Sequence, residues 1–383
     1  MTRATASAAT AVLDADDLIA AAARQAGGEP QVRFRPALAR LTQALDTEAG
    51  LHAAGRQAAR RALIGALVTQ AQQAACPAAG TVPDRPLIIT GMFRTGTTLL
   101  QNLLAEHPAV RAPRLWELLA PAAPAGSAAA RRALAESAAR YVTEYYAAAP
   151  AFRSIHPLAP DRPEECHRLT GVTFTADIYC MRYRVPSYAA WLAGQDLTAA
   201  YRYHRTLLGC LLARQPAGPG QHLVLKCPSH LWHLSALSAV YPGARIVRLH
   251  RHVSACLPSA CSLTAVIRAA RSPVADKREI GQYWLGHASR ALCPPGRRDA
   301  DGVLDIGYDA LVADPVATAE RVREFAGIPP SAGAASRMRR FLAASPAAKH
   351  GTHRYHLADF ALDTAELERR FAPYHAEFGL KPS

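Results

Sequence analysis

Residues 87–100, LIITGMFRTGTTLL, constrain the fold of this 383-residue chain more than any other segment. The apolar run at 87–90 predicts a buried strand, Gly91 and Gly96 bound a tight loop, and a helical pattern begins at Thr97. A strand that passes through such a loop into a helix is the repeating unit of parallel α/β sheets. In such a unit, the backbone N–H groups of the loop and the N-terminus of the helix face a bound anion. The segment therefore predicts an α/β fold with an anion site.

This loop departs from that of a nucleotide triphosphatase. Gly91, Gly96 and Thr98 outline the P-loop pattern G-x-x-x-x-G-x-[ST]. A triphosphatase has lysine after the second glycine, whereas this chain has Thr97, and the only cation in the loop is Arg94. The loop lacks the residue that normally reaches the β- and γ-phosphates of ATP.

Further strands alternate with helices along the chain. Short apolar runs predict strands at 222–226, 244–250 and 303–308, and a helix follows at 315–326. The alternation predicts a P-loop-like three-layer fold, with a central parallel sheet flanked by helices. Periodic segments in 10–75 predict about three more helices. We therefore expect an N-terminal helical extension at 1–82 and a catalytic domain at 83–383.

Polar residues follow the predicted strands, at the edge where ligands of open parallel sheets bind. They are Arg94, Lys226, His250 with Arg251, and Tyr308. A Walker-B strand ends in an aspartate that helps to hold Mg²⁺, whereas the strand at 244–250 leads into Arg251. This pattern predicts a ligand with a second anionic group and no requirement for a metal.

At these motifs the chain resembles sulfotransferases that use 3′-phosphoadenosine 5′-phosphosulfate, in a bacterial-type branch related to tyrosylprotein sulfotransferases. FRTGTTLL at 93–100 matches the family's 5′-phosphosulfate motif, and Arg251 with Ser259 eight positions on matches its 3′-phosphate motif. The resemblance covers about 85–360 and includes similar segments at 111–121, 225–234, 241–251 and 308–315.

The resemblance implies a co-substrate, 3′-phosphoadenosine 5′-phosphosulfate, a product, adenosine 3′,5′-bisphosphate, and no metal. The acceptor is expected to be a small molecule with a hydroxyl group or, as the weaker alternative, an amine. The implied catalytic residues are Arg94, Glu117 as the general base, and Lys226. The implied nucleotide-binding residues are Arg94, Thr95, Gly96, Thr97, Thr98, Leu99, Arg251, Ser259, Tyr308 and Arg354.

The base and the acceptor pocket stay open at this stage. His156 is the alternative base, and Glu164, Glu165 and His167 are candidates for the lining of the acceptor pocket. Each is also compatible with a surface or packing role. Three aromatic residues are expected either in the pocket wall or in the core: Tyr183, Tyr188 and Trp191.

Composition excludes some partners. The formal charge of +14 favours anionic ligands, but the basic residues are scattered, with no run typical of a nucleic-acid interface. Acidic residues near the N-terminus disfavour a signal peptide, no apolar run is long enough for membrane insertion, and the cysteines include no C-x-x-C pair. We therefore expect a cytoplasmic enzyme. The alternatives are a P-loop kinase that uses ATP and Mg²⁺ and a non-catalytic nucleotide-binding protein.

Overall fold

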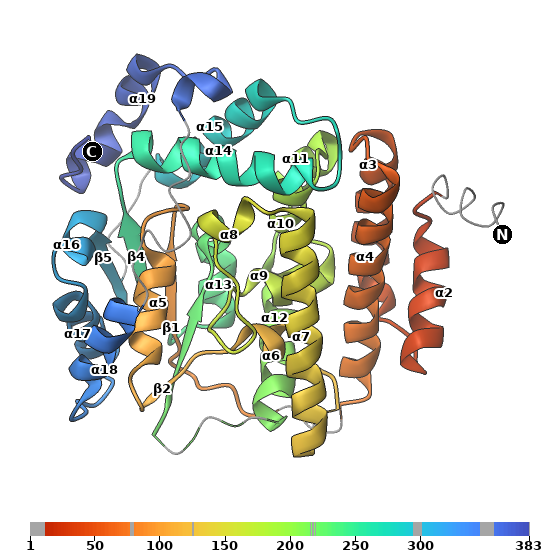
Figure 1. Ribbon diagram of the computed structural model, residues 1–383, viewed down its shortest axis with the longest axis horizontal. Coiled ribbons are helices and arrows are strands. Elements are labelled where there is room, and N and C mark those ends of the chain that lie inside the picture. The colour runs from red at the N-terminus through yellow and green to blue at the C-terminus, as the bar shows by residue number, and fades with distance from the viewer. Residues whose placement is uncertain are drawn as a thin grey trace.

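A five-stranded parallel sheet with the order β2-β3-β1-β4-β5 forms the centre of the computed structural model (Figure 1). The structure describes residues 12–76, 80–124, 126–214, 216, 218, 220–293, 301–344 and 356–382. The strands are β1 (Leu87–Gly91), β2 (Val110–Arg111), β3 (His222–Lys226), β4 (Arg245–His250) and β5 (Val303–Gly307). The predicted α/β class and parallel sheet are confirmed. Only β2 was not predicted, because two residues are too short to show a pattern.

Alternate residues of the strands enter two separate hydrophobic clusters. Ile88, Leu225 and Ile246 belong to one cluster, while Ile89 and Val247 belong to the other. Both faces of the sheet are therefore buried, as expected for parallel strands with continuous apolar runs.

Helices cover both faces. The smaller cluster contains side chains of α5 (Thr97–Ala105), α16 (Tyr308–Ala313), α17 (Pro315–Phe325) and α18 (Ala334–Ala344). The larger one contains side chains of α12 (Thr198–Arg214), α13 (Leu234–Val240), α14 (Val253–Ala269), α15 (Lys277–Leu292) and α19 (Thr364–Glu377). The predicted helix at 315–326 corresponds to α17. This arrangement is the predicted three-layer fold.

Short helices connect these layers. They are α6 (Leu115–Leu119), α8 (Phe152–Ile155), α9 (His167–Thr170), η2 (Gly171–Thr173), α10 (Ile178–Arg182), α11 (Pro186–Ala193), η3 (Pro228–Trp232) and η4 (Leu357–Phe360). The longer α7 (Ala128–Ala148) crosses the face of the molecule that is nearest the viewer in Figure 1.

Three helices precede the sheet, as the periodicity predicts. They are α2 (Ala15–Ala26), α3 (Arg35–Thr47), which a short turn η1 (Val32–Phe34) precedes, and α4 (Ala53–Ala74), and they lie on the side opposite α16–α18 (Figure 1). Gln70 of α4 donates a buried hydrogen bond of 2.7 Å to the Val172 carbonyl. Leu18, Leu38 and Leu63 join the same cluster as Ile88. The helices thus share a core with the sheet, and the domain boundary after residue 82 stays a prediction.

Two further features bear on the setting of the protein. No described helix is both long and apolar enough to cross a bilayer. All eight cysteines fall within the described residues, and none of them forms a disulfide bond.

Candidate active site

The loop between β1 and α5 has the backbone geometry of an anion cradle. Gly91 and Gly96 have φ values of 152° and 90°, in a region that favours glycine. A Cβ on Gly96 would lie 2.5 Å from the Leu311 side chain, so only glycine lets the loop approach α16 this closely. No side chain caps α5 at Gly96. The N–H groups of the first helical turn therefore remain available for a ligand.

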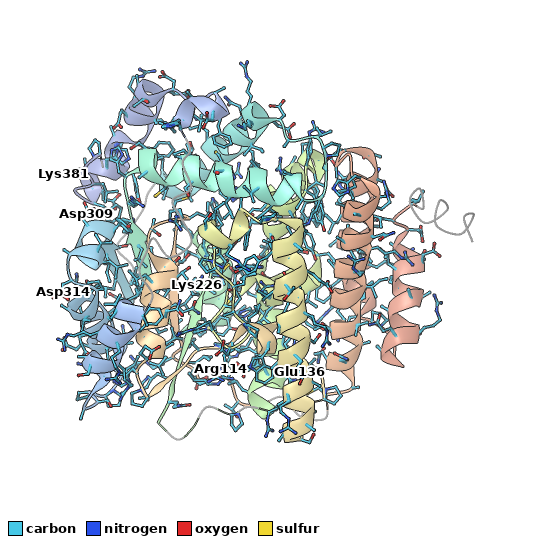
Figure 2. The ribbon with its side chains drawn as sticks, viewed as in Figure 1. Arg114, Glu136, Lys226, Asp309, Asp314 and Lys381 are labelled. Carbon is cyan, nitrogen blue, oxygen red and sulfur yellow. The ribbon has the colours of Figure 1, made fainter. Side chains whose placement is uncertain are left out.

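Lys226 joins this loop from the end of β3. Its side chain is 1% exposed and lies near the middle of the molecule (Figure 2). Its Nζ donates to the Thr98 hydroxyl at 3.2 Å and to the Glu165 carboxylate at 2.7 Å. A buried ammonium group needs such partners, because an unpaired one is costly. The structure thus brings together Lys226 and Thr98, two of the predicted site residues.

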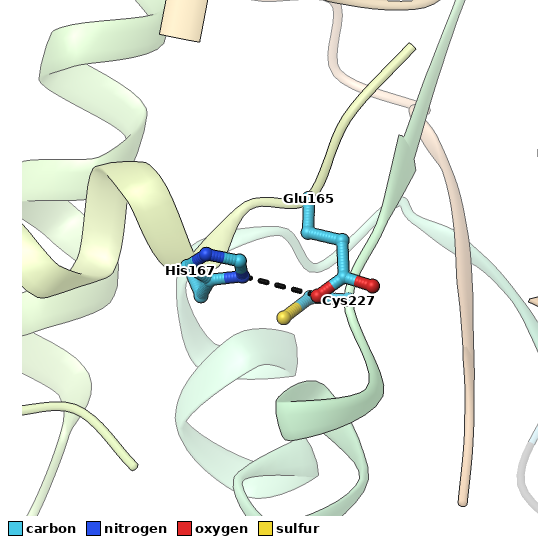
Figure 3. Close-up of side chains that lie close together, drawn as sticks. All are labelled: Glu165, His167 and Cys227. Carbon is cyan, nitrogen blue, oxygen red and sulfur yellow. Dashed lines mark hydrogen bonds and ion pairs between the residues drawn. The ribbon is translucent and has the colours of Figure 1, made fainter. Parts of the chain in front are cut away.

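Glu165 reaches Lys226 because the Cys166 N–H donates to the Lys226 carbonyl at 2.9 Å. The other carboxylate oxygen of Glu165 lies 3.0 Å from His167 Nδ1, and Cys227 lies beside this pair (Figure 3). Burial alone would raise the pKa of Glu165, but Lys226 and His167 outweigh it and hold the pKa well below its usual range. Burial also lowers the pKa of His167 to about 4. At neutral pH, Glu165 is therefore ionised, and His167 is neutral and donates its Nδ1 proton.

The ligand atoms of Glu165, His167 and Cys227 lie within 4.8 Å of one another, which would allow a shared cation. The surrounding chemistry disfavours one. The Glu165 carboxylate is already paired with the Lys226 ammonium. Burial also raises the pKa of the Cys227 thiol well above its usual range. A dication here would have to displace an ammonium and ionise this thiol.

Arg251 brings a second positive charge to the same edge of the sheet. Its Nη1 donates to the Arg94 carbonyl at 3.1 Å, and its guanidinium lies 3.9 Å from the centre of the Tyr308 ring. Buried Arg251 Nε and the Ser259 hydroxyl, on a side chain 1% exposed, find no hydrogen-bond partner within the described part of the chain. Buried polar groups are normally satisfied. Both groups therefore suit an anionic ligand.

A pocket opens beside Lys226, and we call it the Glu165 pocket. The loop residue Phe93 and side chains of α7, α8, α10 and α14 line it, together with four of the residues that the sequence proposed for the base or the pocket: His156, Glu164, Glu165 and His167. Glu164 lies 3.4 Å from His156 Nε2. Burial would raise its pKa, but His156 and Arg168 lower it to about 2. Arg94 joins the loop between β1 and α5 to this wall by donating to the Ile155 carbonyl at 3.1 Å.

Glu117, the predicted base, lies elsewhere. Its carboxylate accepts hydrogen bonds from the Arg111 guanidinium and from the Arg114 N–H, the latter at 2.7 Å. The bond from the Arg114 N–H caps the start of α6. The side chain lines a different pocket, which shares no residue with the Glu165 pocket. The structure therefore does not bring Glu117 to Lys226, and its role as base stays a prediction.

Other expectations have mixed outcomes. Tyr183 and Tyr188 are buried in the hydrophobic core, and Trp191 packs 5.5 Å from Tyr188; none of the three lines the Glu165 pocket. Arg354 lies outside the described residues.

Sequence reasoning missed several residues that do line the Glu165 pocket: Tyr141, Tyr145, Phe152, Arg168 and Arg182. The only signal in the sequence was the spacing of Tyr141 and Tyr145, which lie four residues apart, as side chains on one face of a helix do.

Comparison with known proteins agrees with this geometry. A family model described as "Sulfotransferase family" matches residues 86–332, which is more than half of the chain. The chain belongs to the sulfotransferase family. It is similar to the crystal structure of sulfotransferase STF1 from Mycobacterium tuberculosis, with 29% identity and a TM-score of 0.76 over 94% of this chain and 99% of that one. Sulfotransferase STF9 from Mycobacterium avium has 25% identity and a TM-score of 0.82, over 96% and 97% of the two chains. No match was found among functionally curated proteins.

These matches confirm the resemblance to bacterial sulfotransferases and support a transferase. They favour a sulfotransferase over the alternative of a P-loop kinase.

Proposed function

We propose that this sulfotransferase moves a sulfuryl group from 3′-phosphoadenosine 5′-phosphosulfate to a hydroxyl group of a small acceptor. The weaker alternative acceptor is an amine. One observation carries the proposal: the glycine-bounded loop, Lys226 and Arg251 gather at one sheet edge, where Arg251 Nε and Ser259 Oγ are buried without a partner among the described residues. Two separate positive sites suit a nucleotide with anionic groups at both its 5′ and 3′ positions.

In this proposal the loop and Arg251 bind opposite ends of the nucleotide. The N–H groups of residues 95–99, with the Thr97 and Thr98 hydroxyls and Arg94, hold the 5′-phosphosulfate. Arg251 and Ser259 hold the 3′-phosphate, and the Tyr308 ring supports the Arg251 guanidinium through a cation–π contact. Arg354 is a further proposed contact. No residue role requires a metal.

Transfer then proceeds in line, through a loose transition state like that of phosphoryl transfer. The acceptor oxygen forms a bond to sulfur as the bond from sulfur to the 5′-phosphate oxygen breaks. Lys226 stabilises the charge that develops on the departing oxygen. It lies close enough to do so, because it already contacts Thr98 in the first turn of α5.

Glu165 is the base that the geometry favours over Glu117. Glu165 pairs with Lys226 in the structure, so an incoming sulfuryl group would draw the ammonium away and free one carboxylate oxygen. The acceptor hydroxyl can then donate its proton to that oxygen, while His167 fixes the other one.

We also propose a cytoplasmic location, which suits a protein whose eight cysteines form no disulfide in the described structure.

The role of Arg251 predicts a loss of affinity that depends on the 3′-phosphate. We expect Arg251→Ala to weaken binding of adenosine 3′,5′-bisphosphate by about 100-fold, since a charge-assisted hydrogen bond contributes about 1.5–3 kcal/mol. Binding of adenosine 5′-monophosphate, which has no 3′-phosphate, should change little. Isothermal titration calorimetry with both nucleotides measures the difference. An equal loss for the two ligands would contradict the assignment of Arg251 to the 3′-phosphate.

A direct assay tests the activity itself. The protein is incubated with ³⁵S-labelled 3′-phosphoadenosine 5′-phosphosulfate and a panel of phenols, aliphatic alcohols and amines, and labelled products are separated by chromatography. We expect sulfated products from at least one hydroxyl acceptor. Tight binding of adenosine 3′,5′-bisphosphate with no transfer to any acceptor would favour a non-catalytic nucleotide-binding protein.

A further inference from the structure

Two arginines and two glutamates line the Glu165 pocket, and Lys226, which pairs with one of these glutamates, adds a third positive charge beside it. Glu164 is paired with Arg168 at 3.6 Å, and Glu165 is paired with Lys226 at 2.7 Å. Arg182, at the end of α10, lines the same pocket. It has no hydrogen bond or ion pair to any described residue, in contrast to both of the other cations. One arginine of the lining therefore has no counterion in the described part of the chain.

Other side chains beside Arg182 also indicate a positive potential in this part of the pocket. The Arg168 side chain is 7% exposed, and its Nε is buried without a hydrogen-bond partner in the described structure. Its Nη1 donates to the Tyr141 hydroxyl at 3.2 Å. Burial alone would raise the pKa of Tyr141, but the charges of Arg168, Arg182 and Arg271 outweigh it and lower the pKa. The wall formed by α7, α9 and α10 thus has a positive potential, and a buried donor on it is left unsatisfied.

The rest of the pocket is apolar and aromatic. Tyr145 and Phe152 meet edge to face, with ring centres 4.7 Å apart. Phe93 and Met181 complete this part of the lining. Such a surface suits a planar or apolar body. An ionised group would be stable on it only where a counterion is present.

We infer that the acceptor is a hydroxylated carboxylic acid with an aromatic or apolar body, whose carboxylate pairs with Arg182 while its hydroxyl lies at Glu165 and Lys226. This inference rests on the proposed function for the position of the hydroxyl. A single unpaired guanidinium matches a single negative charge, and its planar fork matches the two oxygens of a carboxylate. Arg182 is then a residue that determines acceptor specificity.

The N-terminal helices contribute to the same region. A second pocket, lined in part by Arg61 of α4, shares Tyr141, Arg168 and Arg182 with the Glu165 pocket. Arg182 therefore stands between the two cavities.

Matched acids and amides test the inference. The probes are 4-hydroxybenzoate, 4-hydroxyphenylacetate and 3-(4-hydroxyphenyl)propanoate, each with its neutral primary amide, so that charge changes while shape is kept. Each is titrated calorimetrically into the protein saturated with adenosine 3′,5′-bisphosphate. We expect at least one acid to bind tenfold or more tightly than its amide. Arg182→Gln should abolish this preference, and Arg182→Lys should retain part of it.

Arg202→Gln is the control, because Arg202 is exposed on α12, lines a separate pocket, and its loss changes the net charge equally. It should leave the acid preference intact. Equal binding of acid and amide by the parent, or an acid preference that survives in Arg182→Gln, would overturn the inference.

Turnover with ³⁵S-labelled donor separates this inference from the proposed function. Binding of acids that depends on Arg182, without transfer to any probe, would refute the transfer activity and leave the carboxylate site standing. Transfer to amides and acids alike, unaffected by Arg182→Gln, would support the activity and refute the site.

Discussion

Lys226→Met is expected to lower the rate of sulfuryl transfer by about 10²–10³-fold, the loss typical when a preorganised charge-stabilising group is removed. Methionine keeps the length and apolar stem of the side chain but not its charge. The affinity for adenosine 3′,5′-bisphosphate should change far less, because the proposed function assigns the binding of the phosphates to the loop amides and Arg251. Single-turnover transfer of ³⁵S and calorimetric titration measure the two quantities.

The same substitution is expected to destabilise the fold. It leaves the Glu165 carboxylate buried without its ammonium partner, and breaking a buried pair costs about 3–5 kcal/mol. The double variant Lys226→Met, Glu165→Gln removes both charges and should recover most of the free energy of unfolding, measured by urea denaturation, but not the activity. If Lys226→Met folds stably and transfers sulfate at the parent rate, Lys226 has no catalytic role.

Glu165→Gln is expected to lower the turnover number by at least about 10²-fold, since general-base catalysis typically contributes about 10²–10⁴. Glutamine fills the same volume and can still contact Lys226 and His167, but it cannot accept a proton from the acceptor. Donor affinity should stay close to that of the parent. Steady-state kinetics at saturating donor measures this effect.

Glu117→Gln is the matched comparison, because Glu117 was the base expected from the sequence. Its carboxylate pairs with Arg111 and caps α6. We therefore expect a lower free energy of unfolding with a nearly unchanged turnover number per folded molecule. The reverse pattern, with Glu117→Gln inactive and Glu165→Gln active, would restore Glu117 as the base.

The strands and the nucleotide loop could be predicted because local sequence determines them. β1, β3, β4 and β5 are apolar runs that end in a polar residue or a glycine, and loop glycines mark the helix start at Thr97. The carboxyl ends of parallel strands share one edge, which is why Lys226 and Arg251 were expected beside this loop. Contacts from Lys226 to Thr98 and from Arg251 to Arg94 place them there.

The sequence named Glu165 as a candidate for the pocket, but the contacts of this pocket could not be predicted, because they join segments far apart in the chain. Glu165 meets Lys226 across 61 positions through the backbone bond of Cys166. Arg182 lies in a five-residue helix and carries no motif that distinguishes it from a surface arginine. For Glu117, a match to a family motif could not show that Arg111 would occupy both carboxylate oxygens.

Calorimetric titration of the parent protein with adenosine 3′,5′-bisphosphate and with ATP, each with Mg²⁺ and with EDTA, tests the central claim most directly. Two positive sites on one sheet edge should bind the bisphosphate tightly in both conditions, and at least about 100-fold more tightly than ATP. Binding of ATP that equals or exceeds that of the bisphosphate and disappears in EDTA would contradict the claim.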